Sequence, residues 1–82
     1  MFNVYILLCE DGYLYTGLTG NLKKRIEEHK SGLSPLTKNR GLIRLVYQES
    51  FSTRHLAAKR EKEIKGWGRS KKEILINKDN NK

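Results

Sequence analysis

The sequence predicts an α/β (α+β) domain in which a small three-stranded, mainly antiparallel sheet is flanked by helices in the order β-β-α-β-α-α. Two apolar segments rich in β-branched and aromatic residues, 2–9 and 13–18, follow one another across a short turn and predict a hairpin. Residues 22–30 and 54–65 repeat apolar positions at helical spacing, and the strand-like segment 42–51 lies between them.

Length and composition narrow the classes of protein. The 82 residues suit one domain, 1–82, which buries only about 60% of the surface of its unfolded chain, so no deep cavity is expected. A formal charge of +8 favours a polyanionic partner such as nucleic acid. A single cysteine excludes a disulfide within the chain and a cysteine-based zinc site. With no membrane-length apolar run and no signal-peptide layout, we expect a soluble, cytoplasmic protein without a membrane partner.

The turn of the hairpin decides which side chains share a sheet face. With Asp11-Gly12 alone as the loop, Tyr5 and Tyr15 would lie on opposite faces. With Glu10-Asp11-Gly12 as the loop and its glycine at positive φ, Tyr5 opposes Gly17 and becomes a diagonal neighbour of Tyr15. We expect this second register. The other face, which we expect to be the better buried, comprises Val4, Ile6, Leu8, Leu14, Thr16 and Leu18.

The first helix adds two polar groups to the face that the tyrosines share. Asn21 is its expected N-cap, and Ser31-Gly32 ends it. Arg25 and His29 share a side with its apolar residues, where partial loss of water costs free energy unless partners or a ligand satisfy them. The plainer interpretation is two boundary residues with packed stems and solvated heads. The informative point is that Tyr5, Tyr15, Arg25 and His29 can converge on one surface.

The remaining segments are predicted from turn residues and periodicity. Residues 32–41 contain Pro35 and several turn formers and predict a mobile loop. In the third strand, Leu42 and Val46 are expected on one face. The other face would hold Ile43, Leu45 and Tyr47.

The C-terminal part is expected to be helical. Ser52-Thr53 caps the helix 54–65, which ends near Gly66, just before Trp67. Its expected inner side consists of Leu56, Ala57, Arg60 and Ile64. A short helix over 70–76 follows, and the polar residues 77–82 are expected to fray.

The order of these residues resembles a GIY-YIG endonuclease domain, in the small single-domain bacterial branch of that superfamily. Asn3-Val4-Tyr5 and Tyr15-Thr16-Gly17 stand at the two family triplets, with only the Tyr of the first and the Tyr and Gly of the second as literal matches. The likeness runs to about Ile76. Its further support is Thr19, Arg25, His29 and Thr37, then Ala57-Ala58-Lys59-Arg60-Glu61, then Ile64-Lys65.

The resemblance implies hydrolysis of nucleic-acid phosphodiester bonds with one divalent cation, Mg²⁺, for which Mn²⁺ can substitute. It assigns the metal to Glu61 by the spacing from Ala57, because Glu63 lies about as near the apolar stripe of the helix. Without the resemblance, a surface ion pair would be the preferred interpretation of either carboxylate.

The resemblance also implies roles for the remaining site residues. Tyr5 resembles the general base, a role that needs nearby positive charge because a free phenol has a pKa near 10. Tyr15 would position the water or the scissile phosphate, and Arg25 would stabilise the transition state. His29 would either relay the proton or hold Tyr5 by a hydrogen bond. Asn77 stands roughly where relatives carry a supporting Asn.

The basic surface implies dominant phosphate contact and poor base readout. The candidate contacts are Lys38, Arg40, Lys59, Arg60, Lys62, Lys65, Arg69, Lys71 and Lys72. We expect structure-selective cleavage of DNA, with a protein partner for targeting, although the sequence is compatible with RNA as well. The alternative is a non-catalytic nucleic-acid-binding module on the same fold. A ribosomal RNA-binding protein would explain the charge but not the order of site residues.

Overall fold

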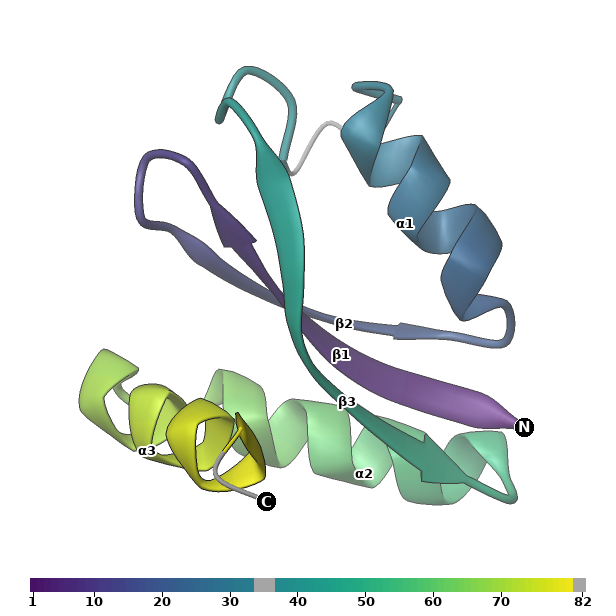
Figure 1. Ribbon diagram of the computed structural model, residues 1–82. Coiled ribbons are helices and arrows are strands. Elements are labelled where there is room, and N and C mark those ends of the chain that lie inside the picture. The colour runs from purple at the N-terminus through teal and green to yellow at the C-terminus, as the bar shows by residue number, and fades with distance from the viewer. Residues whose placement is uncertain (34–36, 81–82) are drawn as a thin grey trace.

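The computed structural model contains a three-stranded sheet and three helices (Figure 1). The strands are β1 (Phe2–Cys9), β2 (Leu14–Thr19) and β3 (Ile43–Phe51), and the helices are α1 (Leu22–Lys30), α2 (Arg54–Lys65) and α3 (Arg69–Asn80). The structure describes residues 1–33 and 37–80. Both strand pairs are antiparallel, in the order β2-β1-β3, which confirms the predicted class and element order.

The β1–β2 hairpin has the register that a three-residue loop requires. Tyr5 opposes Gly17, and Leu7 opposes Tyr15. Gly12 has φ 90° and donates its backbone N–H to the carbonyl of Cys9 at 2.9 Å. A positive φ at this position suits glycine because a Cβ would strain the backbone there. Tyr5 and Tyr15 therefore lie on one face, as predicted.

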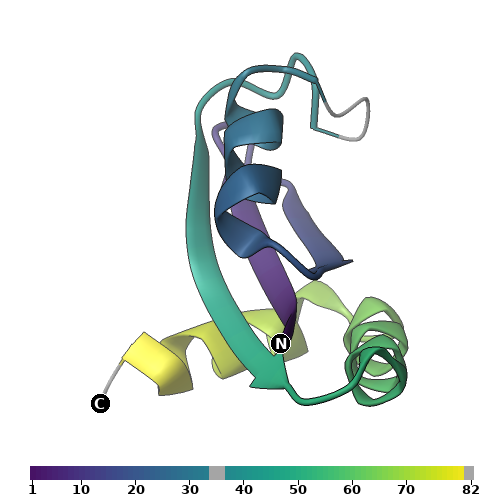
Figure 2. The same cartoon turned by 90° about the vertical axis from the view of Figure 1, so that its right-hand side faces the viewer.

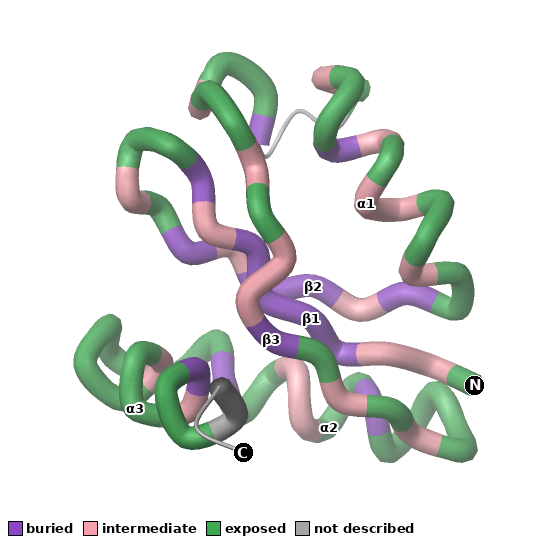
Figure 3. Tube along the Cα trace, in the orientation of Figure 1, coloured by how far each residue is buried: buried purple, intermediate pink, exposed green. Residues whose placement is uncertain are grey.

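Helices cover both faces of the sheet. Figure 1 and Figure 2 show α1 against one face and α2 with α3 across the other. The hydrophobic core lies on the second of these faces and consists of Val4, Ile6, Leu14, Tyr47, Ala57, Ile64 and Ile76. Figure 3 shows buried residues concentrated along the strands, while the outer sides of the helices are exposed. Burial of this apolar set supplies the main stabilisation of the fold.

A β-bulge divides the central pairing of β1 with β3. Ile6 opposes Tyr47, whereas Leu7 opposes Leu45, so one extra residue, Val46, lies on β3 between the two pairs. The extra residue reverses the alternation of side chains beyond it. The predicted grouping of Tyr47 with Ile43 and Leu45 is therefore wrong, since Tyr47 belongs to the core and Leu45 pairs on the face that α1 covers.

The first two helices begin at the predicted caps. The Asn21 side chain accepts a hydrogen bond from the Lys24 backbone N–H at 3.2 Å, and Thr53 accepts one from Leu56 at 3.2 Å. Such caps satisfy backbone donors that lack a partner within the helix. The predicted inner position of Leu56 is wrong, because 46% of that residue is exposed.

The C-terminal helix is longer than predicted. α3 runs to Asn80 instead of ending at Ile76, so residues 77–80, expected to fray, continue the helix, and residues 81–82 lie outside the described part. Pro35 of the predicted loop also lies outside it. Among the residues that the structure describes, no helix is both long and apolar enough to cross a membrane.

Candidate active site

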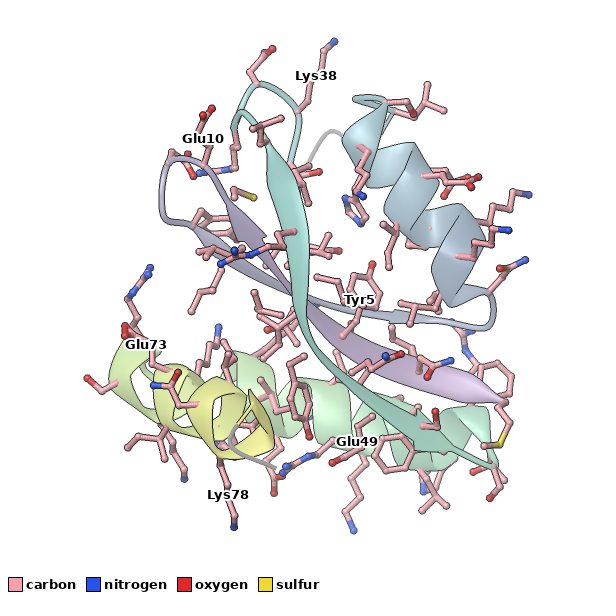
Figure 4. All side chains as sticks on the ribbon, in the orientation of Figure 1. Tyr5, Glu10, Lys38, Glu49, Glu73 and Lys78 are labelled. Atoms are coloured by element: carbon pink, nitrogen blue, oxygen red, sulfur yellow. The ribbon has the colours of Figure 1, made fainter. Side chains whose placement is uncertain are left out.

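Of the four residues expected to converge on one surface, Tyr5, Tyr15 and His29 meet between the sheet and α1. The Tyr5 hydroxyl oxygen lies 3.1 Å from Nε2 of His29, at hydrogen-bonding distance. The ring centroid of Tyr15 lies 6.2 Å from that of Tyr5 and 5.1 Å from that of His29. Figure 4 shows the Tyr5 ring on the sheet face that α1 covers. β1, β2 and α1 thus each contribute one ring to the cluster.

Thr37 is a further member of this cluster. Its Oγ1 lies 2.7 Å from Nδ1 of His29, so both ring nitrogens of His29 have a partner. His29 is 2% exposed and Thr37 is 1% exposed. Buried polar groups in such positions are costly unless they are hydrogen-bonded. The sequence order included Thr37 but gave no role to it, since nothing in a loop sequence indicates which side chain turns inward.

Gly17 makes room for the Tyr5 ring. A Cβ at Gly17 would lie 2.5 Å from Cζ of Tyr5, far inside the distance of ordinary contact. The absence of a side chain lets the phenol lie directly over β2.

Arg25 lies at the rim of the cluster. Its side chain is 42% exposed, and its Nε lies 3.1 Å from Oε1 of Glu28. Its guanidinium charge opposes the effect of burial, which raises the pKa of Tyr5, and adds to the effect of burial that lowers the pKa of His29. Arg25 therefore influences both rings while its own charge still reaches solvent.

Burial determines the protonation of the two hydrogen-bonded rings. Burial, reinforced by Tyr15 and opposed by Arg25, raises the pKa of Tyr5 to about 12. Burial and the Arg25 charge lower the pKa of His29, and Glu28 opposes them. Near neutral pH the pair is thus a phenol beside a neutral imidazole. The positive charge expected to favour the phenolate is present, but desolvation outweighs it.

Glu61 lies on α2, the helix that supplies Ala57 and Ile64 to the hydrophobic core. α2 packs on the face opposite to Tyr5, and within residues 1–33 and 37–80 no hydrogen bond or ion pair joins Glu61 to the cluster. Its carboxylate, 21% exposed, pairs with Lys65 at 3.3 Å. Glu63 is 55% exposed and pairs with Arg60.

Few of the described residues could hold the implied divalent metal ion. In the described part of the chain, no group of three or more His, Cys, Asp or Glu residues is placed to hold a metal ion. A single half-buried carboxylate such as Glu61 still fits Mg²⁺, because this ion keeps several water ligands and takes others from substrate phosphates.

All three arginines predicted to bind phosphate have partners within the protein. Arg40 pairs with Asp11 at 2.9 Å. Arg60 pairs with Glu49 and Glu63, and Arg69 pairs with Glu73 and the carbonyl of Gly12. Figure 4 shows Lys38 extending outward from its loop. The exposed basic candidates are Lys38, Lys59, Lys62, Lys65, Arg69 and Lys71, and Lys72 is half-buried.

Asn77 does not join the tyrosines. It lines a hollow of about 240 Å³ with Leu8, Leu14 and Arg44 on the core side of the sheet. Leu8 and Leu14 oppose one another in the hairpin, on the face that carries Val4 and not Tyr5. In the described residues no hydrogen bond links Asn77 to His29 or Tyr5, and its supporting role stays a prediction.

Comparison with known proteins identifies the family of proteins that share this fold. The model of the GIY-YIG catalytic domain matches residues 1–81. A UPF0213 protein of Staphylococcus saprophyticus is 49% identical over 74 residues, which are 89% of this chain and 90% of the relative. The chain belongs to the GIY-YIG family, as its residue order predicted. Members of this family are generally endonucleases that depend on a divalent metal.

Solved structures agree with this assignment. The solution NMR structure of a UPF0213 protein from Bacillus halodurans has a TM-score of 0.62 at 42% identity, covering 94% of this chain and 84% of that one. A protein from E. faecalis, also solved by NMR, has a TM-score of 0.66 at 33% identity, covering 98% and 86%.

Gly17→Ala is expected to destabilise the fold by about 1–3 kcal/mol, because the added Cβ collides with the Tyr5 ring. Chemical denaturation gives the change in unfolding free energy. The control is the same substitution in a Tyr5→Ala background, where the collision is absent and the cost of Gly17→Ala is expected to be much smaller. Equal costs in the two backgrounds would contradict the proposed contact.

The free energy of unfolding is expected to fall as the pH drops below about 6.5, the ordinary pKa of histidine. The pKa of His29 is depressed in the folded state, so the unfolded state binds more protons and the stabilisation present above that pH is lost on acidification. Denaturation between about pH 7.5 and 5.5 measures the slope. His29→Gln should flatten it and His55→Gln, at an exposed position, should not. An unchanged slope in His29→Gln would refute this attribution.

Proposed function

We propose that the protein is a metal-dependent endonuclease that hydrolyses phosphodiester bonds of DNA, with a preference for branched or flapped structures. The observation that carries the proposal is the buried hydrogen bond between Tyr5 and His29 in a member of the GIY-YIG family. Withdrawing a phenol and an imidazole from water has a cost that apolar side chains in the same place would avoid. Their use in proton transfer gives a reason for this arrangement.

The proton path follows from the protonation of the two rings. Tyr5 is a phenol and cannot accept a proton while it keeps its own. Because His29 is neutral, its Nε2 can take the phenol proton as the Tyr5 oxygen accepts one from the attacking water. The products are a phenol and an imidazolium, so the charge of the pair rises by one when the water becomes the nucleophile. His29 would thus act as a relay as well as a hydrogen-bond partner.

Access to this pair lies on the side of Arg25 and Tyr15. Tyr5 is 0% exposed, whereas these two neighbours are partly exposed. In this proposal Arg25 leaves Glu28 and pairs with a substrate phosphate, for which its guanidinium moves outward. The guanidinium then stabilises the negative charge that is added in the transition state. Tyr15 would orient the phosphate or the water from its half-exposed position.

Glu61 would hold the Mg²⁺ ion, or Mn²⁺ in its place, and the bound ion would neutralise charge on the scissile phosphate. The lower exposure of Glu61 supports its choice over Glu63. The Glu61 side chain is 21% exposed and is better screened from bulk water than the Glu63 side chain, which is 55% exposed. Lys65 would have to release Glu61 or share it.

Affinity for DNA would come chiefly from the exposed lysines, in a chain of formal charge +8. The arginines that pair within the protein would contribute less. An 82-residue chain offers little surface for reading bases, so a protein partner would direct it to its substrate, and we expect it to act in the cytoplasm.

The second candidate function is a non-catalytic nucleic-acid-binding module. The complete burial of Tyr5 favours it, because a general base must reach the proton that it removes. So does the lack, in the described residues, of a hydrogen bond or ion pair between Glu61 and the cluster. Binding needs only the charge of the surface.

Tyr5→Phe separates the two functions. It removes one hydroxyl, so cleavage of a branched DNA should fall by about 100-fold or more, the scale of losing a general base. Binding should change little. Single-turnover cleavage and a gel-shift titration measure the two effects. The matched control is the double variant Lys71→Ala with Lys72→Ala, which should affect binding and leave the chemistry intact. It should bind DNA more weakly, show a flatter salt dependence of binding and cleave at an unchanged rate at saturating protein. Full cleavage by Tyr5→Phe would remove Tyr5 from the proposed chemistry.

Two neighbouring glutamates on α2 test the metal assignment. Glu61→Gln should abolish metal-dependent cleavage, while Glu63→Gln should leave it largely intact, since each substitution removes one charge at nearly constant shape. Cleavage is measured across a Mg²⁺ titration, with thermal unfolding as the check on folding. The reverse pattern would transfer the metal to Glu63.

A further inference from the structure

The structure extends the Tyr5–His29 pair into a chain of three buried groups. Oγ1 of Thr37 lies 2.7 Å from Nδ1 of His29, whose Nε2 lies 3.1 Å from the Tyr5 hydroxyl. All three residues are at most 2% exposed, so water does not compete for these bonds. A buried hydroxyl that contacts the far side of an imidazole is in the position of a group that orients the ring.

The turn over residues 37–40, which carries Thr37, is held by contacts within it and with the hairpin. The backbone N–H of Arg40 donates to the carbonyl of Thr37 at 3.3 Å, and Asn39 turns the chain with φ 66°. The Arg40 guanidinium pairs with Asp11 at 2.9 Å and stacks 4.0 Å from the ring centroid of Tyr13. Arg40 therefore ties this turn to the β1–β2 hairpin, which gives it a structural task besides the phosphate contact expected of it.

The two neutral forms of His29 imply opposite hydrogen-bond directions. Tyr5 keeps its proton, so its O–H can donate to Nε2, which lies 3.1 Å from the phenol oxygen. A neutral imidazole whose Nε2 accepts must carry its hydrogen on Nδ1, and Nδ1–H then donates to Oγ1 of Thr37. In the opposite tautomer, an Nε2–H would face the Tyr5 oxygen and could not receive a proton from it.

We infer that Thr37 is a positioning residue that holds His29 in the Nδ1–H tautomer and leaves Nε2 free to accept the Tyr5 proton. Its effect on cleavage rests on the proposed function, whereas its effect on the tautomer does not. Thr37 acts through His29 and touches no reacting atom.

The ¹⁵N shifts of the imidazole nitrogens report the tautomer directly, and the chain has only two histidines. His55 is exposed and serves as the internal reference. We expect the Nδ1–H form at His29 in the wild type, in Thr37→Ser and in Tyr5→Phe. In Thr37→Val, which keeps the shape but removes the acceptor, the Nδ1–H form should cease to dominate. Cleavage by Thr37→Val should fall by about 10-fold or more, and Thr37→Ser should restore it.

An Nε2–H form in the wild type would overturn the inference, as would a Thr37→Val protein with an unchanged tautomer. If Thr37→Val does not fold, the tautomer of His29 in the wild type and in Tyr5→Phe tests the inference. Loss of the Nδ1–H form in Tyr5→Phe would show that Tyr5, and not Thr37, sets the tautomer, and would overturn the inference. An inactive wild type with the expected tautomer pattern would support the role of Thr37 and overturn the nuclease function alone.

Discussion

The buried hydrogen bond between Tyr5 and His29 depends on features from three separate segments of the chain. The three-residue turn at Gly12 sets the register that turns Tyr5 toward α1. Gly17 leaves space for the phenol over β2, and the Asn21 cap starts the helix that delivers His29. Each of these features contributes to the geometry that brings the two rings together.

The two faces of the sheet have different tasks. The face toward α2 and α3 holds the hydrophobic core, whose burial stabilises the chain. The face toward α1 holds Tyr5, His29 and Thr37, which gain little from leaving water and need one another as partners. The bulge at Val46 adds to this division, since it turns Tyr47 into the core and leaves Leu45 on the other face. Burial of the hydrophobic core thereby offsets the desolvation cost of Tyr5, His29 and Thr37.

Local sequence signals predicted the fold and the register, but not the interactions between distant segments. The turn glycine and the cap residues act within a few positions, so the hairpin and the helix starts followed from them. The bulge did not, because one inserted residue leaves an apolar strand pattern intact. Thr37 and Arg40 take their roles from contacts with His29 and Asp11, which no spacing indicates. The direction in which the pKa of Tyr5 shifts could not be predicted either, because it depends on how deeply the ring is buried.

The central claim is that this site cuts nucleic acid. The most direct measurement is incubation of the purified protein with branched, flapped and duplex DNA in Mg²⁺, in Mn²⁺ and in excess chelator, with the products resolved on denaturing gels. We expect cleavage that requires the metal, is strongest on branched or flapped DNA and stops with chelator. Salt-sensitive binding without cleavage of any substrate in either metal would contradict it and leave a nucleic-acid-binding module on the GIY-YIG fold.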